Sequence, residues 1–374
     1  MMRNSILNGR HIALGSKLDG DTWNDMPVPW AYSTCANDEV VSIRTHAGLF
    51  DVSALNLVDV AGVDAERVLN TLVAKDITRL KVGTAIIAAE LNEAGALCDD
   101  IMIIRVATDV FKVSHGSGKT LNNLQALAAG KNIKIERDTD THVVSLQGPK
   151  ALEILAPHVA VKLAGLPYFN FVKTTLFGID VTIGRGGYAG ERGYEVYGAS
   201  KDMVTLWDKL LEVGKPLGAI AASWNCLELT RVEAALQFFP FEMPEGDTTP
   251  WEAGLGWAVD VDKEADYTGK AAVLKSRGYE RVKHIGLVCN SDVAVETGAK
   301  IMKDGVEVGV ITSSSYSRYL MRSLALAHIK PEYTNIGTGV EVVGSLSTCK
   351  ARVAQTPFYD PMRLRSHPEK FKGQ

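Results

Sequence analysis

The last third of the chain carries the pattern that most narrows the possible folds. From about Lys283 onward, nearly every apolar run is short and rich in β-branched residues, and the turn residues Asp304-Gly305 and Gly337 separate these runs. Short strands at this spacing favour a small closed or sandwiched β domain. The strands that we expect in it are 285–289, 300–302, 306–311, 323–328 and 339–343.

The first two thirds of the chain mix helical and strand patterns. Amphipathic spacing predicts helices at 65–73, 201–213 and 223–236. Residues 237–257 show no clear periodicity and form a connection of a length that often carries function. Further strands are expected at 56–60, 84–90, 101–106, 110–114, 143–146, 171–177 and 180–183. We therefore assign the chain to the α+β class, with a β-rich C-terminal module.

Length and charge exclude several classes of protein. With 374 residues the chain is longer than one hydrophobic core usually serves, which predicts two or three domains. Its 40 Lys and Arg against 44 Asp and Glu give a net charge of −4, which argues against a nucleic-acid partner. No apolar stretch approaches the roughly 18 residues that cross a bilayer, and the polar N-terminus lacks a signal-peptide core. We expect a soluble cytoplasmic protein with no membrane partner.

The cysteines and histidines argue against a metal site. The five cysteines are an odd number, lie far apart and form no Cys-x-x-Cys pair, so we expect neither a disulfide framework nor structural zinc. The eight histidines show no i,i+4 spacing of the kind that places two ligands on one helix face. No metal is therefore expected.

Three short motifs have an ordinary structural explanation. The GSGKT sequence at 116–120 resembles a phosphate loop, but Val113 occupies the position of the first glycine, so a turn is expected. Asp99 and Asp100 precede a buried strand, and strand alternation lets only one of the two carboxylates point at any given site. Glu228 and Arg231, three residues apart on a helix, are expected to form a solvated ion pair.

Residues 184–195 are the most unusual stretch, with five glycines, two tyrosines and two glutamates. Glycines let the backbone approach a flat ligand closely, and Tyr and Glu supply ring faces and hydrogen-bond acceptors. The alternative is a mobile surface loop. Two tyrosines make that alternative less attractive, because exposed loops seldom keep aromatic pairs without packing.

Seven ordered matches span nearly the whole chain. They comprise LGSK at 14–17 with WNDMP at 23–27, AGLFDVS at 47–53, LNEAGALCDD at 91–100, LQGPKA at 146–151, GYAGERGYE at 187–195, TTPWEAGLGWAV at 248–259 and PFYDP at 357–361. Together they resemble the folate-dependent glycine-cleavage T-protein (aminomethyltransferase) family. That family includes folate-dependent demethylases such as dimethylsulfoniopropionate demethylase.

The resemblance implies a three-domain ring around a central channel that holds tetrahydrofolate. The domains expected from it are a discontinuous folate-binding domain of 1–52 plus 141–245, a second α+β domain of 53–140, a linker of 246–282, a C-terminal β domain of 283–360 and a tail of 361–374.

The resemblance also assigns roles to particular residues. Asp100 corresponds to the catalytic carboxylate near N5 of the pterin. Glu195 corresponds to the carboxylate that binds the amino-pyrimidine edge, whose adjacent N–H donors suit a two-acceptor group. Further cofactor-binding positions expected from it are Tyr188, Arg231, Leu55 and Trp257.

The departures from the family pattern bear on the donor of the one-carbon unit. Ala54 stands where the family has a histidine, and Leu227-Glu228 stands where it has Arg-Asp. These changes resemble relatives that remove a methyl group, so we expect methyl transfer from a small methylated donor to N5 of tetrahydrofolate. One alternative is the glycine-cleavage aminomethyltransferase reaction on a lipoylated carrier protein. Another is a folate-binding protein without transferase activity.

Overall fold

The computed structural model describes residues 3–116 and 118–371, which mix helices and strands. They form two compact units. Unit 1 combines the described parts of Met1–Asn56, Asp138–Arg231 and Met362–Gln374, and unit 2 combines those of Leu57–Arg137 and Val232–Pro361. The finer division into domains that the resemblance implies stays a prediction.

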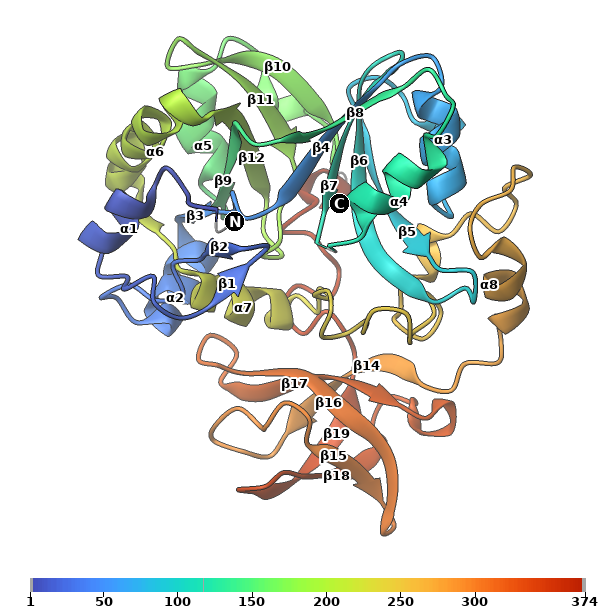
Figure 1. Cartoon of the computed structure of the whole chain (residues 1–374). Coiled ribbons are helices and arrows are strands. Elements are labelled where there is room, and N and C mark those ends of the chain that lie inside the picture. The colour runs from blue at the N-terminus through green and yellow to red at the C-terminus, as the bar shows by residue number, and fades with distance from the viewer. Residues whose placement is uncertain (1–2, 117, 372–374) are drawn as a thin grey trace. The chain divides into compact units, whose positions relative to one another are not determined.

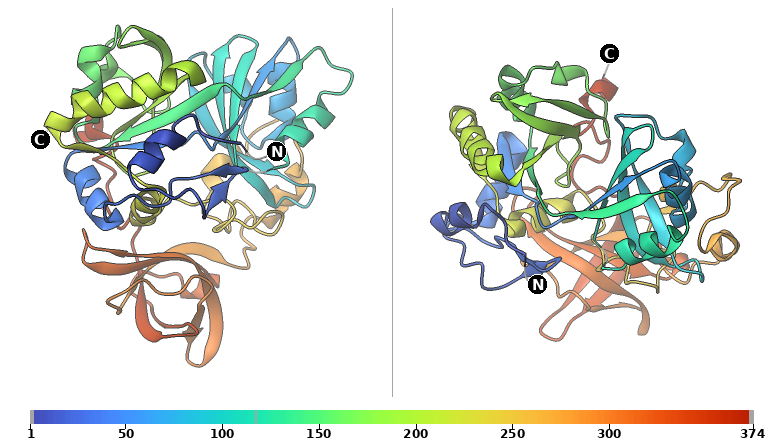
Figure 2. Two further views of the ribbon diagram at one scale, coloured as in Figure 1. Left: turned by 60° about the vertical axis from the view of Figure 1, so that its left-hand side comes forward. Right: turned by 45° about the horizontal axis from the view of Figure 1, so that its top comes forward.

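Unit 1 is built on a mixed sheet with the strand order β10-β11-β12-β9-β3-β13. Its neighbouring strands are antiparallel except β3 and β13, which run parallel. The strands are β10 (Phe171–Leu176), β11 (Ile179–Arg185), β12 (Gly193–Ala199), β9 (Thr141–Gln147), β3 (Ala47–Asp51) and β13 (Ala219–Ala221). Helix α6 (Ser200–Gly214) lies along this sheet (Figure 2) and buries Leu206, Trp207 and Leu210 in its core.

Unit 2 contains a second sheet with the order β5-β6-β7-β4-β8. Its strands are β5 (Ala85–Leu91), β6 (Leu97–Ala107), β7 (Val110–His115), β4 (Asn56–Ala61) and β8 (Lys134–Asp138). Helices α3 (Ala65–Leu72) and α4 (Thr120–Leu127) pack on it, so that Leu69 and Leu124 share a core with Ile101 and Phe111. Val113 lies inside β7, as expected for a turn at 116–120, of which Ser117 is outside the described residues.

The C-terminal part of unit 2 is a closed barrel of antiparallel strands (Figure 1), which confirms the β-rich module expected from the sequence. Around the barrel run β14 (Lys283–Cys289), β17 (Arg322–Ile329), β16 (Val306–Ser317), β15 (Lys300–Lys303), β18 (Gly339–Val343) and β19 (Thr348–Ala354). Leu287, Ile301, Ile311 and Ala325 belong to its apolar core. Because the barrel closes, its strands pair on both sides and need no covering at an edge.

The remaining elements are short. The other helices are α1 (Asn8–Ala13), α2 (Ala36–Thr45), α5 (Ala151–Leu155), α7 (Trp224–Glu233) and α8 (Lys270–Ser276). The other strands are β1 (Thr22–Trp23) and β2 (Met26–Pro27). The 3-10 turns are η1 (Ile77–Arg79), η2 (Ala156–His158), η3 (Leu163–Gly165), η4 (Lys215–Leu217), η5 (Gly256–Ala258), η6 (Pro331–Tyr333) and η7 (Pro368–Phe371). Helix α7 ends earlier than the predicted 223–236, because Ala235 adopts a left-handed φ of 50°. Across 3–116 and 118–371, no helix is both long and apolar enough to pass through a membrane.

Candidate functional site

Asp99 and Asp100 are neighbours on β6 with different surroundings. Asp99 is buried, and its Oδ1 accepts the N–H of Asp100 at 2.8 Å while its Oδ2 accepts the N–H of Gly116 at 2.8 Å. Asp100 stands opposite Ala89 of β5 and is partly exposed. Backbone N–H groups thus bind both oxygens of Asp99, which leaves Asp100 as the candidate for contact with a ligand.

The carboxyl group of Asp100 holds its proton more tightly than an exposed aspartate does. Its pKa lies well above the ordinary value, first because burial removes water from the charged group, and then because Asp99 and Glu242 are negatively charged neighbours. A carboxyl group tuned in this way can take up or release a proton closer to neutral pH than an exposed one.

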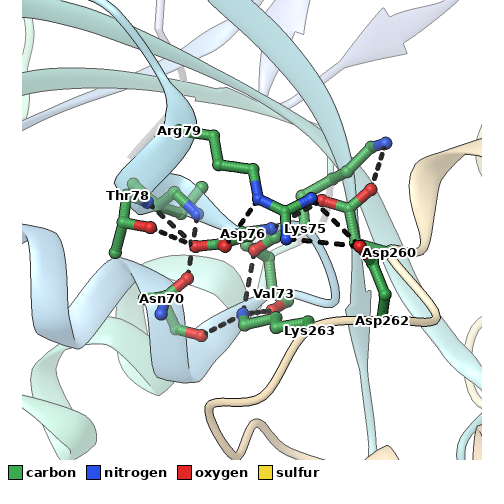
Figure 3. Close-up of polar contacts among 10 residues, drawn as sticks. Asn70, Val73, Lys75, Asp76, Thr78, Arg79, Asp260, Asp262 and Lys263 are labelled. Atoms are coloured by element: carbon green, nitrogen blue, oxygen red, sulfur yellow. Dashed lines mark hydrogen bonds and ion pairs between the residues drawn. The ribbon is translucent and has the colours of Figure 1, made fainter.

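A buried lysine fastens the segment that follows Trp257 (Figure 3). Trp257 lies in η5 with 55% of its surface exposed. Six residues later, Lys263 Nζ donates to the backbone oxygens of Asn70 at 2.5 Å, Val73 at 2.8 Å and Lys75 at 2.8 Å. The lysine is buried, and burial lowers its pKa to about 8. Asn70 lies in the last turn of α3, where helices leave acceptors unpaired, and Val73 and Lys75 follow the helix.

The same segment reaches the strand pair that carries Asp100. The carboxylate of Asp260 accepts from Lys75 Nζ at 2.8 Å and from the N–H of Asp76 at 2.9 Å. The N–H of Asp260 donates to Ala74 O at 3.1 Å, and the N–H of Ala74 donates to Ala89 O at 2.9 Å. Ala89 is the register partner of Asp100. The contacts of Lys263 and Asp260, which we call the lysine clamp, therefore connect to the strand pair beside the candidate catalytic residue.

In unit 1, Glu195 projects from β12 within a set of polar and aromatic neighbours. The hydroxyl of Tyr197 donates to Glu195 Oε2 at 2.9 Å. Oε1 makes no hydrogen bond to another described residue, and the side chain is partly exposed. Burial raises the pKa of Glu195, and burial together with the nearby carboxylate raises that of Tyr197. Glu195 therefore keeps one acceptor oxygen available.

Aromatic rings line this part of unit 1. Phe171 lies 5.8 Å from the ring of Tyr197, and Tyr168 lies 4.4 Å from the ring of Phe169. Burial, and secondly the charge of Glu195, raises the pKa of the Tyr168 hydroxyl. Gly184 makes the packing of Phe171 possible, because a Cβ there would approach Phe171 Cε1 to 2.3 Å.

The glycine-rich stretch begins and ends in strands, and residues 186–192 form the connection between them. Its start belongs to β11 and its end to β12, and Tyr188 is half-buried in the turn that joins them. Gly187 has a φ of 151°, and a Cβ at that position would overlap the side chain of Gln147. The amide of Gln147 donates to Gly186 O at 3.1 Å, which ties this turn to the sheet.

The remaining predicted residues of unit 1 have different environments. Leu55 is half-buried directly before β4, and its backbone oxygen accepts from Arg3 Nη2 at 3.4 Å. Arg231 is fully buried and binds Glu228 through two contacts, Nε to Oε2 at 2.9 Å and Nη2 to Oε1 at 2.5 Å. The expected solvated pair is therefore wrong for the arginine, because the Arg231 side chain is 1% exposed while that of Glu228 is 28% exposed.

The predicted residues divide between the two units. Leu55, Tyr188, Glu195 and Arg231 belong to unit 1, and Asp100 and Trp257 belong to unit 2. Sequence reasoning missed Tyr197, although it shares a strand face with Glu195 because residues i and i+2 point the same way. It also missed Tyr168 and Glu242, which are distant in sequence from Glu195 and Asp100. Within the described ranges, no three His, Cys, Asp or Glu side chains are grouped to hold a metal ion.

Comparison with known families gives matches over most of the chain. A model described as the GCVT N-terminal domain matches residues 7–263. A second, described as the glycine cleavage T-protein C-terminal barrel domain, matches residues 283–360. The second match coincides with the closed barrel of unit 2.

Individual proteins are similar over nearly their full length. The chain is 39% identical over 372 residues to the heme-dependent oxidative N-demethylase gamma subunit of Ectopseudomonas mendocina, with 97% of each chain covered. It is 34% identical over 351 residues to an aminomethyltransferase of Bacillus cereus, covering 92% of this chain and 94% of that one. The crystal structure of the glycine cleavage system aminomethyltransferase T from Bartonella henselae matches with a TM-score of 0.88 and 25% identity, covering 96% of this chain and 99% of that one.

Proposed function

The chain belongs to the glycine cleavage T-protein family, and we propose on that premise that it transfers a one-carbon unit from a small methylated donor to tetrahydrofolate. When bound, tetrahydrofolate would supply N5, the nucleophilic nitrogen that accepts the carbon. The observation that carries the proposal is the pairing of this family membership with Asp100, a partly exposed carboxyl group on β6 whose pKa is raised by burial.

A methylated amine is the donor class that we favour. The relative from Ectopseudomonas mendocina, 39% identical, is named an oxidative N-demethylase subunit, and the aminomethyltransferase of Bacillus cereus is 34% identical. Ala54 and Leu227-Glu228, which replace the family's histidine and Arg-Asp, also favour a changed donor. By analogy with that gamma subunit, a partner chain would carry out any oxidation of the N-methyl group before the carbon is transferred.

The residues of unit 1 fit an aromatic heterocycle with N–H donors on one edge. Glu195 offers the available oxygen Oε1, while Tyr197 holds Oε2. The rings of Tyr168 and Phe171 supply flat apolar surface beside it, and Gly184 leaves room for one of them. A carboxylate that accepts two adjacent N–H groups is a strong and directional contact. We propose that Glu195 holds the pterin edge and that Tyr188 contributes a ring.

The other proposed roles follow from position. Asp100 would hold at its carboxyl oxygen the proton that leaves the acceptor nitrogen, and would stabilise positive charge that develops there. Leu55 and Trp257 would supply apolar contacts to the cofactor. Buried Arg231 would act through Glu228, whose carboxylate is partly exposed.

Labelled donors test the proposal. The protein is incubated with tetrahydrofolate and one of three carbon-13 donors: a methylated sulfonium, a methylated amine together with the other subunits of the Ectopseudomonas N-demethylase, or an aminomethyl-lipoyl carrier protein. Mass spectrometry then identifies the folate product. Label from either methylated donor supports the proposal.

Two other outcomes would replace the proposal. Label from the lipoyl carrier alone would establish the aminomethyltransferase reaction, the second candidate, which the match to the Bartonella henselae structure favours. Folate binding with no labelled product from any donor would identify a binding protein without transferase activity.

A further inference from the structure

The C-terminal tail, residues 362–371, packs within unit 1 against the turn that precedes β10. The ring centroid of His367 lies 4.5 Å from that of Tyr168, with the ring planes at 62°. The ring centroid of Tyr168 in turn lies 4.4 Å from that of Phe169. His367 Nδ1 lies 3.3 Å from Glu369 Oε1, a contact within the tail that orients the histidine ring. The tail therefore meets the turn through a ring whose position is fixed.

Buried Arg185, the last residue of β11, joins the tail to the same turn through hydrogen bonds. Its Nη2 donates to Ser366 O at 3.1 Å and to Glu369 Oε2 at 2.7 Å, both in the tail. Its Nη1 donates to Leu166 O at 2.9 Å, just before Tyr168 in the chain. The planar guanidinium presents its donors in fixed directions, so it holds the tail and the turn together.

Phe169 has an unusual backbone conformation in this turn. Its φ is 58°, in the left-handed region that a bulky residue rarely adopts. The N–H of Phe169 donates to Arg185 O at 2.9 Å, and the N–H of Asn170 donates to Pro167 O at 3.1 Å. Such a conformation persists only where the surrounding structure holds it. The tail is part of that surrounding structure, because it contacts both Tyr168 and Arg185.

The turn lies on the face of the sheet that carries Glu195. Gly184 of β11 is the register partner of both Phe171 and Glu195. A Cβ on Gly184 would point into the Phe171 ring, so that ring lies on the same face as the Glu195 side chain. The N–H of Gly186 continues the pairing of β11 with β12, and a Cβ there would lie 3.6 Å from Phe169 Cε1. Positions two apart on a strand face the same way, so Phe169 lies beside Phe171 on this face.

We propose that the C-terminal tail sets the position of the turn that carries Tyr168 and Phe169, and that His367 is a positioning residue for the site beside Glu195. The inference rests on the proposed function for the identity of the ligand, because Tyr168 is one of the rings that would lie beside the pterin edge. His367 would act through Tyr168 and touch no ligand itself. The aromatic surface would then exist before the ligand arrives, so that binding does not have to order it.

Digestion with chymotrypsin tests the hold of the tail on the turn in the full chain without ligand, because this protease cuts after Tyr and Phe. His367→Ala should speed cleavage after Tyr168 and Phe169 by about fivefold or more, since a turn that has lost a contact opens more often. Mass spectrometry identifies the fragments that end at these two residues. His367→Phe keeps a ring and should restore most of the wild-type resistance. An unchanged rate in His367→Ala, or equal rates in the two variants, would overturn the proposal.

His158→Ala is the matched control. The ring centroid of His158 lies 4.8 Å from that of Phe177, so this substitution removes a similar ring contact from unit 1. Phe177 follows β10, whereas the turn precedes it, so cleavage after Tyr168 and Phe169 should stay at the wild-type rate. A rate raised as much as in His367→Ala would indicate general loosening of unit 1 and would overturn the proposal.

Binding of tetrahydrofolate tests the effect on the site. Calorimetric titration should give a dissociation constant that His367→Ala raises about 5–10-fold, and that His367→Phe and His158→Ala change less than about twofold. Where turnover is measurable, His367→Ala should raise the KM for tetrahydrofolate and leave kcat nearly unchanged. Equal dissociation constants in His367→Ala and the wild type would overturn the link to the site. If the wild type binds no tetrahydrofolate, the proposed function fails, and the cleavage rates still decide whether the tail holds the turn.

Discussion

At the scale of single residues, the adjacent aspartates Asp99 and Asp100 have different roles because neighbouring residues of a strand face opposite sides. Asp99 binds two backbone N–H groups, those of Asp100 and Gly116, and so holds the turn after β7 against β6. Asp100 faces acidic neighbours instead, and burial raises its pKa. The first carboxylate therefore has a structural role, and the second is the proposed catalytic group.

Replacing Asp100 by Asn should abolish most activity without abolishing ligand binding. The amide keeps the shape of the side chain but cannot exchange a proton, so we expect kcat to fall roughly 100-fold or more. The tetrahydrofolate dissociation constant should change little. Steady-state kinetics and calorimetric titration measure the two quantities. Asp99→Asn is an unsuitable control, because it disturbs the turn after β7. Full turnover in Asp100→Asn would show that Asp100 has no part in the mechanism.

The same substitution should stabilise the chain in a pH-dependent way. Because the pKa of Asp100 is higher in the folded chain than its ordinary value of 3.8, the folded state binds more protons between those two values. Its stability therefore falls as pH rises through that window, and the whole penalty is present above the folded pKa. Asp100→Asn should melt higher than the wild type at pH 7, and the two should converge as pH approaches 3.8. Calorimetry from pH 4 to 8 checks this; a constant difference would contradict it.

The candidate site was partly predictable from sequence. Asp100 and Glu195 stand inside recognisable motifs, and strand alternation already limited the aspartate pair to one useful carboxylate. Tyr168 and Glu242 carry no such signal, because their relation to Glu195 and Asp100 arises only when distant segments pack. Arg231 was expected on a solvated face, and no local pattern reveals that its helix is buried on that side.

At the scale of elements, a buried polar network attaches α1 to β3. Asp51, at the end of β3, accepts from Ser5 Oγ at 2.5 Å and lies 2.9 Å from His11 Nε2. His11 Nδ1 lies 2.9 Å from the hydroxyl of Tyr32. Burial alone would raise the pKa of Asp51, but its bonds to His11 and Ser5 lower it overall. The network therefore stabilises the fold when Asp51 is charged.

Asp51→Asn should cost about 3 kcal/mol of unfolding free energy at pH 7, because one partner of a buried pair is lost. In the wild type this contribution is present above the ordinary pKa of 3.8, and it disappears as pH falls through the folded value. Urea unfolding at pH 7 measures the loss. Asp208→Asn is the matched control: its exposed pair with Arg10 also holds α1, and its loss should cost less than about 1 kcal/mol. Equal losses would contradict the assignment.

The lysine clamp should likewise stabilise unit 2 against unfolding. Lys263→Met preserves the apolar stem but leaves three backbone oxygens without their donor, so we expect a loss of about 2–3 kcal/mol. Lys270→Met, in the same segment, removes contacts to Glu264 O and Ala265 O at the surface and should cost under about 1 kcal/mol. Urea midpoints compare the two, and a smaller loss for Lys263→Met than for Lys270→Met would be inconsistent with the clamp.

Elements with strong periodicity were predictable, and others were not. Helix α6 and strand β18 follow the expected ranges closely, because each has a clear apolar face. Strand β3 is buried on both faces and therefore has no alternation to detect. Helix α2 mixes apolar and polar residues weakly, and β19 carries Lys350 and Arg352 on its outer face, so neither stood out from a loop.

At the scale of the whole molecule, ligand binding should appear as added stability. Tetrahydrofolate at 100 times its dissociation constant should stabilise the wild type by about 2.7 kcal/mol, visible as a higher melting temperature. Asp100→Asn should keep this increase. Glu195→Gln should lose most of it, because the amide is uncharged and can place an N–H donor against the N–H donors of the pterin edge. An increase of the same size in Glu195→Gln would exclude that residue from binding.

Unit 1 takes its last piece from the far end of the chain. Arg365 Nε lies 3.1 Å from Glu191 Oε2, and Arg185 Nη2 lies 2.7 Å from Glu369 Oε2. A ribosome that adds about 5–20 residues per second delivers these partners only after the barrel has been made. Unit 1 therefore begins first and is completed last. In nascent chains stalled before residue 362, Arg185 in the sheet of unit 1 should still lack its ion-pair partner Glu369.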